Sequence, residues 1–218
     1  MSLRDLMLLP NDSIVLMPKR NSTTRRAFLT AIASAGVLLG TACVKSPASF
    51  KATDITGAKF ANDFAMTGHD GKPRSLADFK GKVVVVFFGY VQCPDVCPTT
   101  LSTLRTVRER LGADADKLQV VFITVDPERD TREVLSQYVP AFDPSFIGLS
   151  GDAATTERVA REFRVLYTKN AGKTPTSYTV DHSAGVFIFD TQGRIRLYAS
   201  QNMTPENYVH DIRALLST

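Results

Sequence analysis

The chain has 218 residues, of which 44% are hydrophobic, so it is long and apolar enough for one domain of ordinary size plus a leader. Its formal net charge of +4 is concentrated near the N-terminus, because residues 1–42 hold five Lys or Arg against two acids. The remainder of the chain carries 21 bases against 20 acids. A nearly neutral body without a basic stripe argues against nucleic acid as a partner.

Residues 1–42 are predicted to be an export signal. The pair Arg25 and Arg26 precedes an uncharged run, residues 27–42, that is rich in Ala, Leu and Gly, and this pattern resembles a twin-arginine signal. The run of sixteen residues is shorter than the roughly 20 that span a bilayer as a helix. Because acids and apolar residues precede the basic cluster, we expect Met17 to be the true initiator.

Cys43 follows the signal directly and looks like the acceptor cysteine of a bacterial lipoprotein. That motif normally has a large aliphatic residue three positions before the cysteine, where this chain has Gly40. Three outcomes therefore stay open: lipidation of Cys43, an uncleaved N-terminal anchor, or cleavage without a lipid. All three place the protein in the bacterial cell envelope, on the periplasmic side of the cytoplasmic membrane. Residues 43–52 are predicted to be a tether and residues 53–218 the folded domain.

The first half of this domain predicts a strand-helix-strand unit. Residues 64–76 form a predicted hairpin that turns at Asp70-Gly71. Residues 83–88 are apolar without alternation, as expected for a strand buried on both faces. Residues 118–125 are a second, β-branched apolar run, and Gly112 closes the helix between the two strands. The loops that follow both strands should lie at the same carboxyl edge of one sheet.

The second half predicts further helices and strands of the same domain. In chain order these are a short helix capped by Thr131, a helix around 155–165, a loop or hairpin over 167–178, strands over 185–189 and 195–199, and a final helix begun by Thr204 and Pro205. We expect Val159, Phe163 and Leu166 to form the apolar face of the second helix. The order indicates an α/β, thioredoxin-like fold, with a central mixed sheet flanked by helices, an added N-terminal hairpin and an insertion before the His182 strand.

Cys93 and Cys97 lie where the first buried strand passes into a helix, and each is followed by proline. Backbone N–H groups are unpaired in a first helical turn and the helix dipole favours negative charge there, so a cysteine at this junction should ionise more readily than a free one. Pro98 fits the first helical position. A thiolate is both a nucleophile and a soft metal ligand, whereas the spacing alone leaves a structural disulfide open.

Three blocks of sequence, residues 89–100, 124–131 and 178–184, together resemble the Sco/SenC family of copper chaperones over roughly residues 60–216. The resemblance implies a thioredoxin-like domain outside the cytoplasmic membrane that binds copper through Cys93, Cys97 and His182. It also implies delivery of copper to, or thiol reduction of, the dinuclear copper site of cytochrome c oxidase subunit II. At Val91-Gln92 the chain departs from the usual family residues, and we expect a changed surface at most.

The implied ligands suit copper. Cu(I) is soft and prefers thiolates, and an imidazole completes a three-ligand set, while binding of Cu(II) stays open. Loading with Cu(I) needs both sulfurs reduced, so a Cys93–Cys97 disulfide would be the metal-free resting form. Asp126 and Asp181, at strand ends, either orient ligands or serve as turn and cap residues.

Two other functions are weighed against copper transfer. The second hypothesis is a thiol-disulfide reductase in which Cys93 attacks. Reductases of the thioredoxin type usually have CxxC and a facing proline, whereas this chain has CxxxC and His182-Ser183-Ala184 at that place, which favours metal. The third, a peroxiredoxin-like peroxidase, needs a threonine and an arginine near one cysteine, and that pattern is missing. The expected partners are oxidase subunit II, a copper donor protein, a thioredoxin-type reductant and the membrane.

Overall fold

The computed structural model describes residues 49–174 and 177–217, which belong to one compact unit, residues 48–218. The predicted signal, with Met17, and the predicted lipid site, Cys43, lie outside the described residues. The backbone N–H groups of Lys51 and Ala52, placed in the tether from sequence, donate to the carboxylate of Asp211. These two residues are therefore attached to the final helix.

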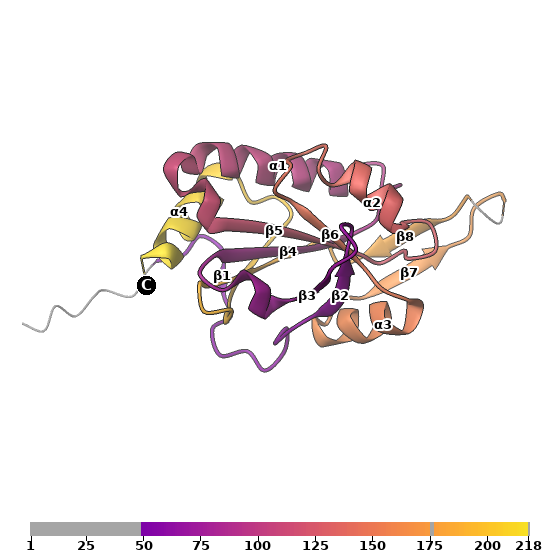
Figure 1. Cartoon of the computed structure of the whole chain (residues 1–218), viewed down its shortest axis with the longest axis horizontal. Helices are drawn as coiled ribbons and strands as arrows, with labels where there is room; N and C mark the ends of the chain where they lie inside the picture. Colours follow the sequence, from indigo (N-terminus) through magenta and orange to yellow (C-terminus); the bar gives the residue numbers. More distant parts are fainter. Residues whose placement is uncertain (1–48, 175–176, 218) are drawn as a thin grey trace, which may run out of the picture. The chain divides into compact units, whose positions relative to one another are not determined.

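The central sheet has eight strands in the order β1-β10-β9-β4-β5-β6-β2-β3 (Figure 1). The strands are β1 (Thr53–Asp54), β2 (Ala65–Gly68), β3 (Pro73–Ser75), β4 (Val83–Gly89), β5 (Leu118–Thr124), β6 (Ile147–Ser150), β9 (Val186–Phe189) and β10 (Ile195–Ala199). Strands β4, β5 and β6 run parallel, and the other pairs are antiparallel. The predicted mixed sheet is confirmed.

Helices cover both faces of this sheet, with α1 and α3 on opposite sides (Figure 1). The helices are α1 (Val96–Leu111), α2 (Arg132–Tyr138), α3 (Ala153–Glu162) and α4 (Pro205–Leu216), with short 3-10 helices η1 (Leu76–Phe79) and η2 (Gly112–Lys117). The predicted caps of α1, α2 and α4 are confirmed, since Gly112 ends α1 with a φ of 59°, and the side chains of Thr131 and Thr204 accept backbone N–H groups.

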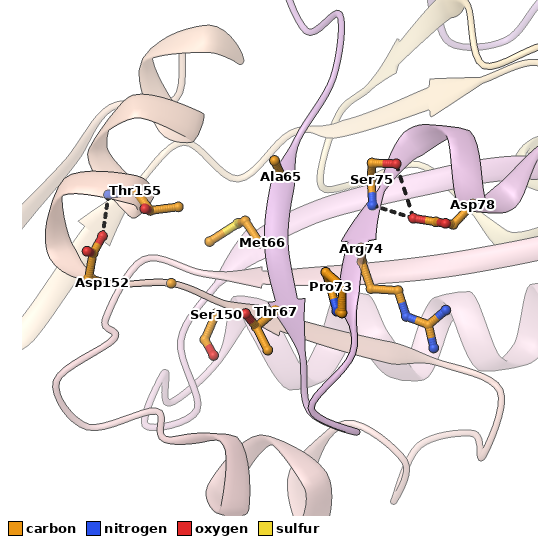
Figure 2. A pocket seen from close by; sticks show the side chains of 11 residues that line it. Ala65, Met66, Thr67, Pro73, Arg74, Ser75, Asp78, Ser150, Asp152 and Thr155 are labelled. Carbon is orange, nitrogen blue, oxygen red and sulfur yellow. Dashed lines mark hydrogen bonds between the residues drawn. The ribbon is translucent and has the colours of Figure 1, made fainter.

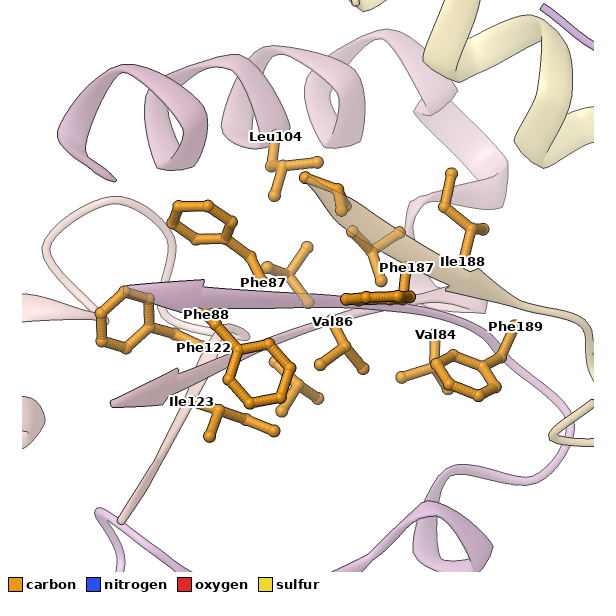
Figure 3. Close-up of a cluster of buried hydrophobic side chains, with 14 of the residues drawn as sticks. Val84, Val86, Phe87, Phe88, Leu104, Phe122, Ile123, Phe187, Ile188 and Phe189 are labelled. Carbon is orange, nitrogen blue, oxygen red and sulfur yellow. The ribbon is translucent and has the colours of Figure 1, made fainter. Parts of the chain in front are cut away.

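The core forms on both faces of β4, which is buried along all seven residues. Successive side chains of a strand point to opposite faces. The Phe87 side chain lies on the same side of β4 as Leu104 of α1, whereas the Phe88 side chain lies on the other side (Figure 3). There the Phe88 ring packs against Phe163 at the end of α3, with centroids 5.1 Å apart. This packing fixes the carboxyl end of β4, from which the cysteine loop begins.

The insertion before the histidine forms a second, two-stranded antiparallel sheet of β7 (Tyr167–Asn170) and β8 (Thr179–His182). The hairpin projects from the carboxyl edge of the central sheet (Figure 1). It confirms the hairpin alternative of the sequence prediction. His182 is the last residue of β8 and pairs with Tyr167.

Several local predictions are wrong. Leu166 is 79% exposed, because α3 ends at Glu162 and the chain has already turned away through Arg164, whose φ is +55°. Pro98 is the third residue of α1, a position whose N–H also lacks an intrahelical partner. Strands β1 and β6 were not predicted, since both are short and pair with partners distant in sequence.

Candidate metal centre

The two cysteines are held at the junction of β4 and α1. Cys93 lies in the connecting loop and is half-buried, whereas Cys97 lies in the first turn of α1 and is fully buried. The N–H of Cys97 points to Cys93 Sγ at 3.4 Å, so an unpaired N–H of the helix start is directed at a sulfur. A Cβ at Gly89 would lie 2.8 Å from Cys97 Sγ. Glycine at this position therefore leaves the room that the buried sulfur occupies.

The imidazole of His182 approaches from the hairpin. Its Nε2 is 3.5 Å from Cys97 Sγ, and its Nδ1 is 3.1 Å from the carbonyl oxygen of Ser183. A carbonyl only accepts, so Nδ1 carries the proton and Nε2 presents its lone pair to the sulfurs. The rings of Phe87 and Tyr90 meet the imidazole edge-on, with centroids 6.2 and 6.0 Å away. The imidazole is thus oriented before any ion is present.

The ligand atoms of Cys93, Cys97 and His182 all lie within 4.8 Å of one another. Among the described residues this is the one group of three or more such side chains close enough to share an ion. Two sulfurs and one imidazole nitrogen form a soft donor set that fits Cu(I) and suits Mg²⁺ or Ca²⁺ poorly. A cavity of about 430 Å³ is lined by Cys93 and His182 among others, whereas Cys97 is buried beneath them.

Burial decides the protonation of these groups. Burial, followed by the hydrogen bond with Cys93, raises the pKa of the Cys97 thiol well above its ordinary value. The expectation of easier ionisation is therefore wrong for Cys97, because loss of water outweighs the helix terminus. Burial also lowers the pKa of His182, so its imidazole is neutral and able to bind metal at neutral pH.

A family model described as SCO1/SenC matches residues 52–217, which is most of the chain. The chain belongs to this family. Its three converging side chains are the ones that the sequence resemblance implied as copper ligands.

Relatives and solved structures support the same membership. The mitochondrial SCO2 homolog of Mus musculus is 37% identical over 153 residues, covering 69% of this chain and 60% of the relative, so the chain spans less than two thirds of such curated relatives. The copper-bound structure of Bradyrhizobium japonicum ScoI is 40% identical, with a TM-score of 0.65 over 70% of this chain and 97% of that one. Apo Sco1 from Thermus thermophilus is also 40% identical, with a TM-score of 0.70 over 78% and 99%.

The two aspartates singled out in this SCO1/SenC sequence lie outside the three-ligand group. Asp126 follows β5, is buried, and accepts hydrogen bonds from Arg129 and from the Tyr178 hydroxyl. Asp181 is exposed in β8 and its backbone pairs with Thr168. The acceptor that orients His182 is instead the backbone carbonyl of its neighbour, which a sequence motif cannot reveal.

Sequence reasoning missed the buried Asp130 beside the centre and the contact that Gln92 makes there. Asp130 is buried, accepts from the Val91 N–H and the Thr124 hydroxyl, and has its pKa raised to about 6, chiefly by burial. Gln92, expected to change only the surface, accepts a hydrogen bond from Arg129. The available signal was the position of the 124–131 block, which begins at the last residue of β5, at the same sheet edge as the cysteine loop.

Other polar groups of the molecule have structural roles. His69 Nδ1 accepts the Gly148 N–H at 3.0 Å, which fixes the β2–β3 turn to β6. A cavity of about 600 Å³ lies between β2 and the start of α3, where Met66 faces the first turn of the helix (Figure 2). The Asp152 side chain in this cavity is used to cap α3 by accepting the Thr155 N–H. In the part of the chain that the structure describes, no group of three or more possible metal ligands lies in this cavity.

Proposed function

We propose that this chain is an extracytoplasmic copper metallochaperone that binds one Cu(I) through Cys93, Cys97 and His182. The observation that carries the proposal is the convergence of two sulfurs and an imidazole nitrogen within 4.8 Å of one another, beside a cavity that Cys93 and His182 line. Three ligands suffice for Cu(I) but leave its coordination open to an incoming thiolate, which favours transfer over permanent storage. Binding of Cu(II) by the same three donors is the alternative.

Family membership supports a role in cytochrome c oxidase assembly. The copper-bound ScoI structure, at 40% identity, supports copper as the ion. On this proposal the acceptor is the dinuclear copper site of oxidase subunit II, the source is a copper donor protein, and a thioredoxin-type reductant keeps both sulfurs reduced. We place the protein at the periplasmic side of the bacterial cytoplasmic membrane, held by an N-terminal anchor or a lipid on Cys43.

The residues of the chain supply the binding step directly. Cys97 reaches the ion from the buried side and must release its proton, since its raised pKa keeps the free thiol neutral. Cys93, half-buried, is the sulfur that an incoming thiolate meets first. His182 offers Nε2 without a proton to lose, because its pKa is lowered by burial.

Copper titration of the reduced chain tests the proposal. We expect one Cu(I) per chain for the wild type, loss of binding on Cys93→Ser or Cys97→Ser, and an affinity roughly tenfold or more lower on His182→Ala, since one of three ligands is removed. His210→Ala is the matched control, because His210 lies on α4 and contacts Asp211. A reduced wild type that binds no Cu(I) contradicts the proposal.

A thiol-disulfide reductase is the second candidate, and one observation favours it. The Cys97 N–H is directed at Cys93 Sγ, which suits a sulfur that attacks as thiolate. His182→Ala separates the candidates: the metallochaperone loses copper affinity and keeps disulfide exchange, whereas a reductase that relies on the imidazole loses exchange and keeps copper. Exchange is followed with a small aromatic disulfide, and copper by titration of the same samples.

A further inference from the structure

Arg129 lies between the two chain segments that carry the proposed copper ligands. It belongs to the loop between β5 and α2, and its side chain is 14% exposed. Its Nε donates to the buried carboxylate of Asp126, and its Nη1 donates to Gln92 Oε1 at 3.0 Å and to the Tyr178 carbonyl at 2.9 Å. One guanidinium thus joins the sheet edge, the cysteine loop and the hairpin.

The hairpin depends on such side-chain contacts for its position. Strands β7 and β8 form a sheet of their own and are not paired with the central sheet. Ladder hydrogen bonds therefore fix His182 relative to Tyr167 of the hairpin, but leave its distance from the cysteines to other contacts. Those contacts include the Arg129 interactions, because Tyr178 immediately precedes β8.

Tyr178 is attached to Arg129 and Asp126 in three ways. Its carbonyl accepts from the guanidinium, its ring centroid lies 3.5 Å from the guanidinium carbon, and its hydroxyl donates to Asp126 Oδ1 at 2.7 Å. A stacked guanidinium that donates from both Nε and Nη1 is a geometry that lysine does not reproduce. Lys169 adds a parallel link from β7, with its Nζ 2.7 Å from Glu128 and 5.0 Å from the Tyr178 ring centroid.

Arg129 also contacts the loop that carries the cysteines. Gln92 is the residue before Cys93, and its side-chain oxygen accepts from the same Nη1 that holds Tyr178. The Tyr90 ring, also in this loop, lies 5.7 Å from the guanidinium carbon. The charge of Arg129 is paired with the buried carboxylate of Asp126.

We propose that Arg129 is a positioning residue for copper binding, holding the hairpin against the cysteine loop so that His182 Nε2 stays within reach of both sulfurs. The inference rests on the proposed function. Arg129 acts through Tyr178 and Gln92 and not on the ion itself. A role limited to fold stability would lower copper affinity whether or not the imidazole is present. Positioning acts only when there is an imidazole to position.

The test is a double-mutant cycle of Arg129→Lys and His182→Ala on the reduced full chain, with Cu(I) affinity measured by competition with bicinchoninate. We expect R129K to lower Cu(I) affinity roughly tenfold when His182 is present, as changes to residues that orient metal ligands do. In the H182A background the same substitution should change the affinity no further, because the hairpin then carries no ligand.

Arg194→Lys is the matched control. Arg194 also donates through Nε to a buried aspartate, Asp190, but at the far end of β9 from His182. The Arg194→Lys substitution should leave Cu(I) affinity unchanged. Equal losses for R129K in both backgrounds, or no loss in either, would overturn the inference.

If R129K does not fold, Tyr178→Phe takes its place in the cycle, since it removes only the hydroxyl that reaches Asp126. The same criteria apply, with a smaller loss expected. A wild-type chain that binds no Cu(I) refutes the proposed function, whereas a wild type that binds Cu(I) with an additive cycle refutes this inference alone.

Discussion

At the scale of single residues, the packing around Cys97 sets the protonation of its thiol, because burial raises the pKa of that group. Cys93, Cys97 and His182 are identified by residue type and by their places beside predicted strands. The buried sulfur of Cys97 and the Phe122 ring both lie close to Gly89, since a Cβ there would approach each to 2.8 Å. Such contacts arise from packing between distant segments, so the direction of the Cys97 pKa shift could not be predicted from the helix terminus alone.

Asp130 provides a pH prediction. Its pKa in the folded protein is about 6, above the ordinary 3.8, chiefly because of burial. A raised pKa means that the fold favours the protonated form, so this contribution to stability is fully present below about pH 4 and is lost as the pH rises through 6. Up to roughly 1 to 3 kcal/mol is involved.

We expect the free energy of unfolding of the wild type to fall relative to Asp130→Asn as the pH rises from about 4 to 7. Denaturant unfolding of both proteins across this range measures the difference. The comparison between the two removes the contributions of other carboxyl groups. A difference that does not change with pH, or that changes in the opposite direction, would contradict the burial argument.

At the scale of elements, the parts predicted correctly are those with a long local pattern. Strands β4 and β5 are uniformly apolar, and the helix between them has a clear stripe and a glycine end. Strand β6, with the sequence Ile-Gly-Leu-Ser, has four residues and is defined by its pairing with β5 and β2. Short strands of this kind are set by their neighbours, and no local signal was available to find them.

Helices α1 and α3 differ in whether the side chain of the residue before the helix caps its first turn. The Asp152 side chain caps α3 by accepting the Thr155 N–H at 2.7 Å, whereas Asp95 precedes α1 without a side-chain cap hydrogen bond. We expect Asp152→Ala to lower the free energy of unfolding by about 1 kcal/mol. Asp95→Ala should cost less than half as much, through the helix dipole alone. Equal costs in denaturant unfolding would refute this difference.

At the scale of the whole folded unit, the segment around Lys51 and the candidate metal centre lie near opposite ends of α1. The segment around Lys51 is attached to Asp211 of α4, and Arg213 of the same helix contacts Arg110 near the end of α1. Cys97 lies at its start. Sixteen residues at about 1.5 Å each give a helix of roughly 24 Å. The cavity beside Cys93 and His182 thus lies about one helix length from the segment around Lys51.

The described part of the chain contains no helix that is both long and apolar enough to cross a bilayer.

The most direct test of the central claim is X-ray absorption at the copper edge on the reduced chain loaded with one Cu(I). The account predicts a first shell of two sulfurs and one imidazole nitrogen, with the nitrogen lost in His182→Ala. A wild-type spectrum without the nitrogen, or with the nitrogen retained in that variant, would contradict the convergence of Cys93, Cys97 and His182 on one ion.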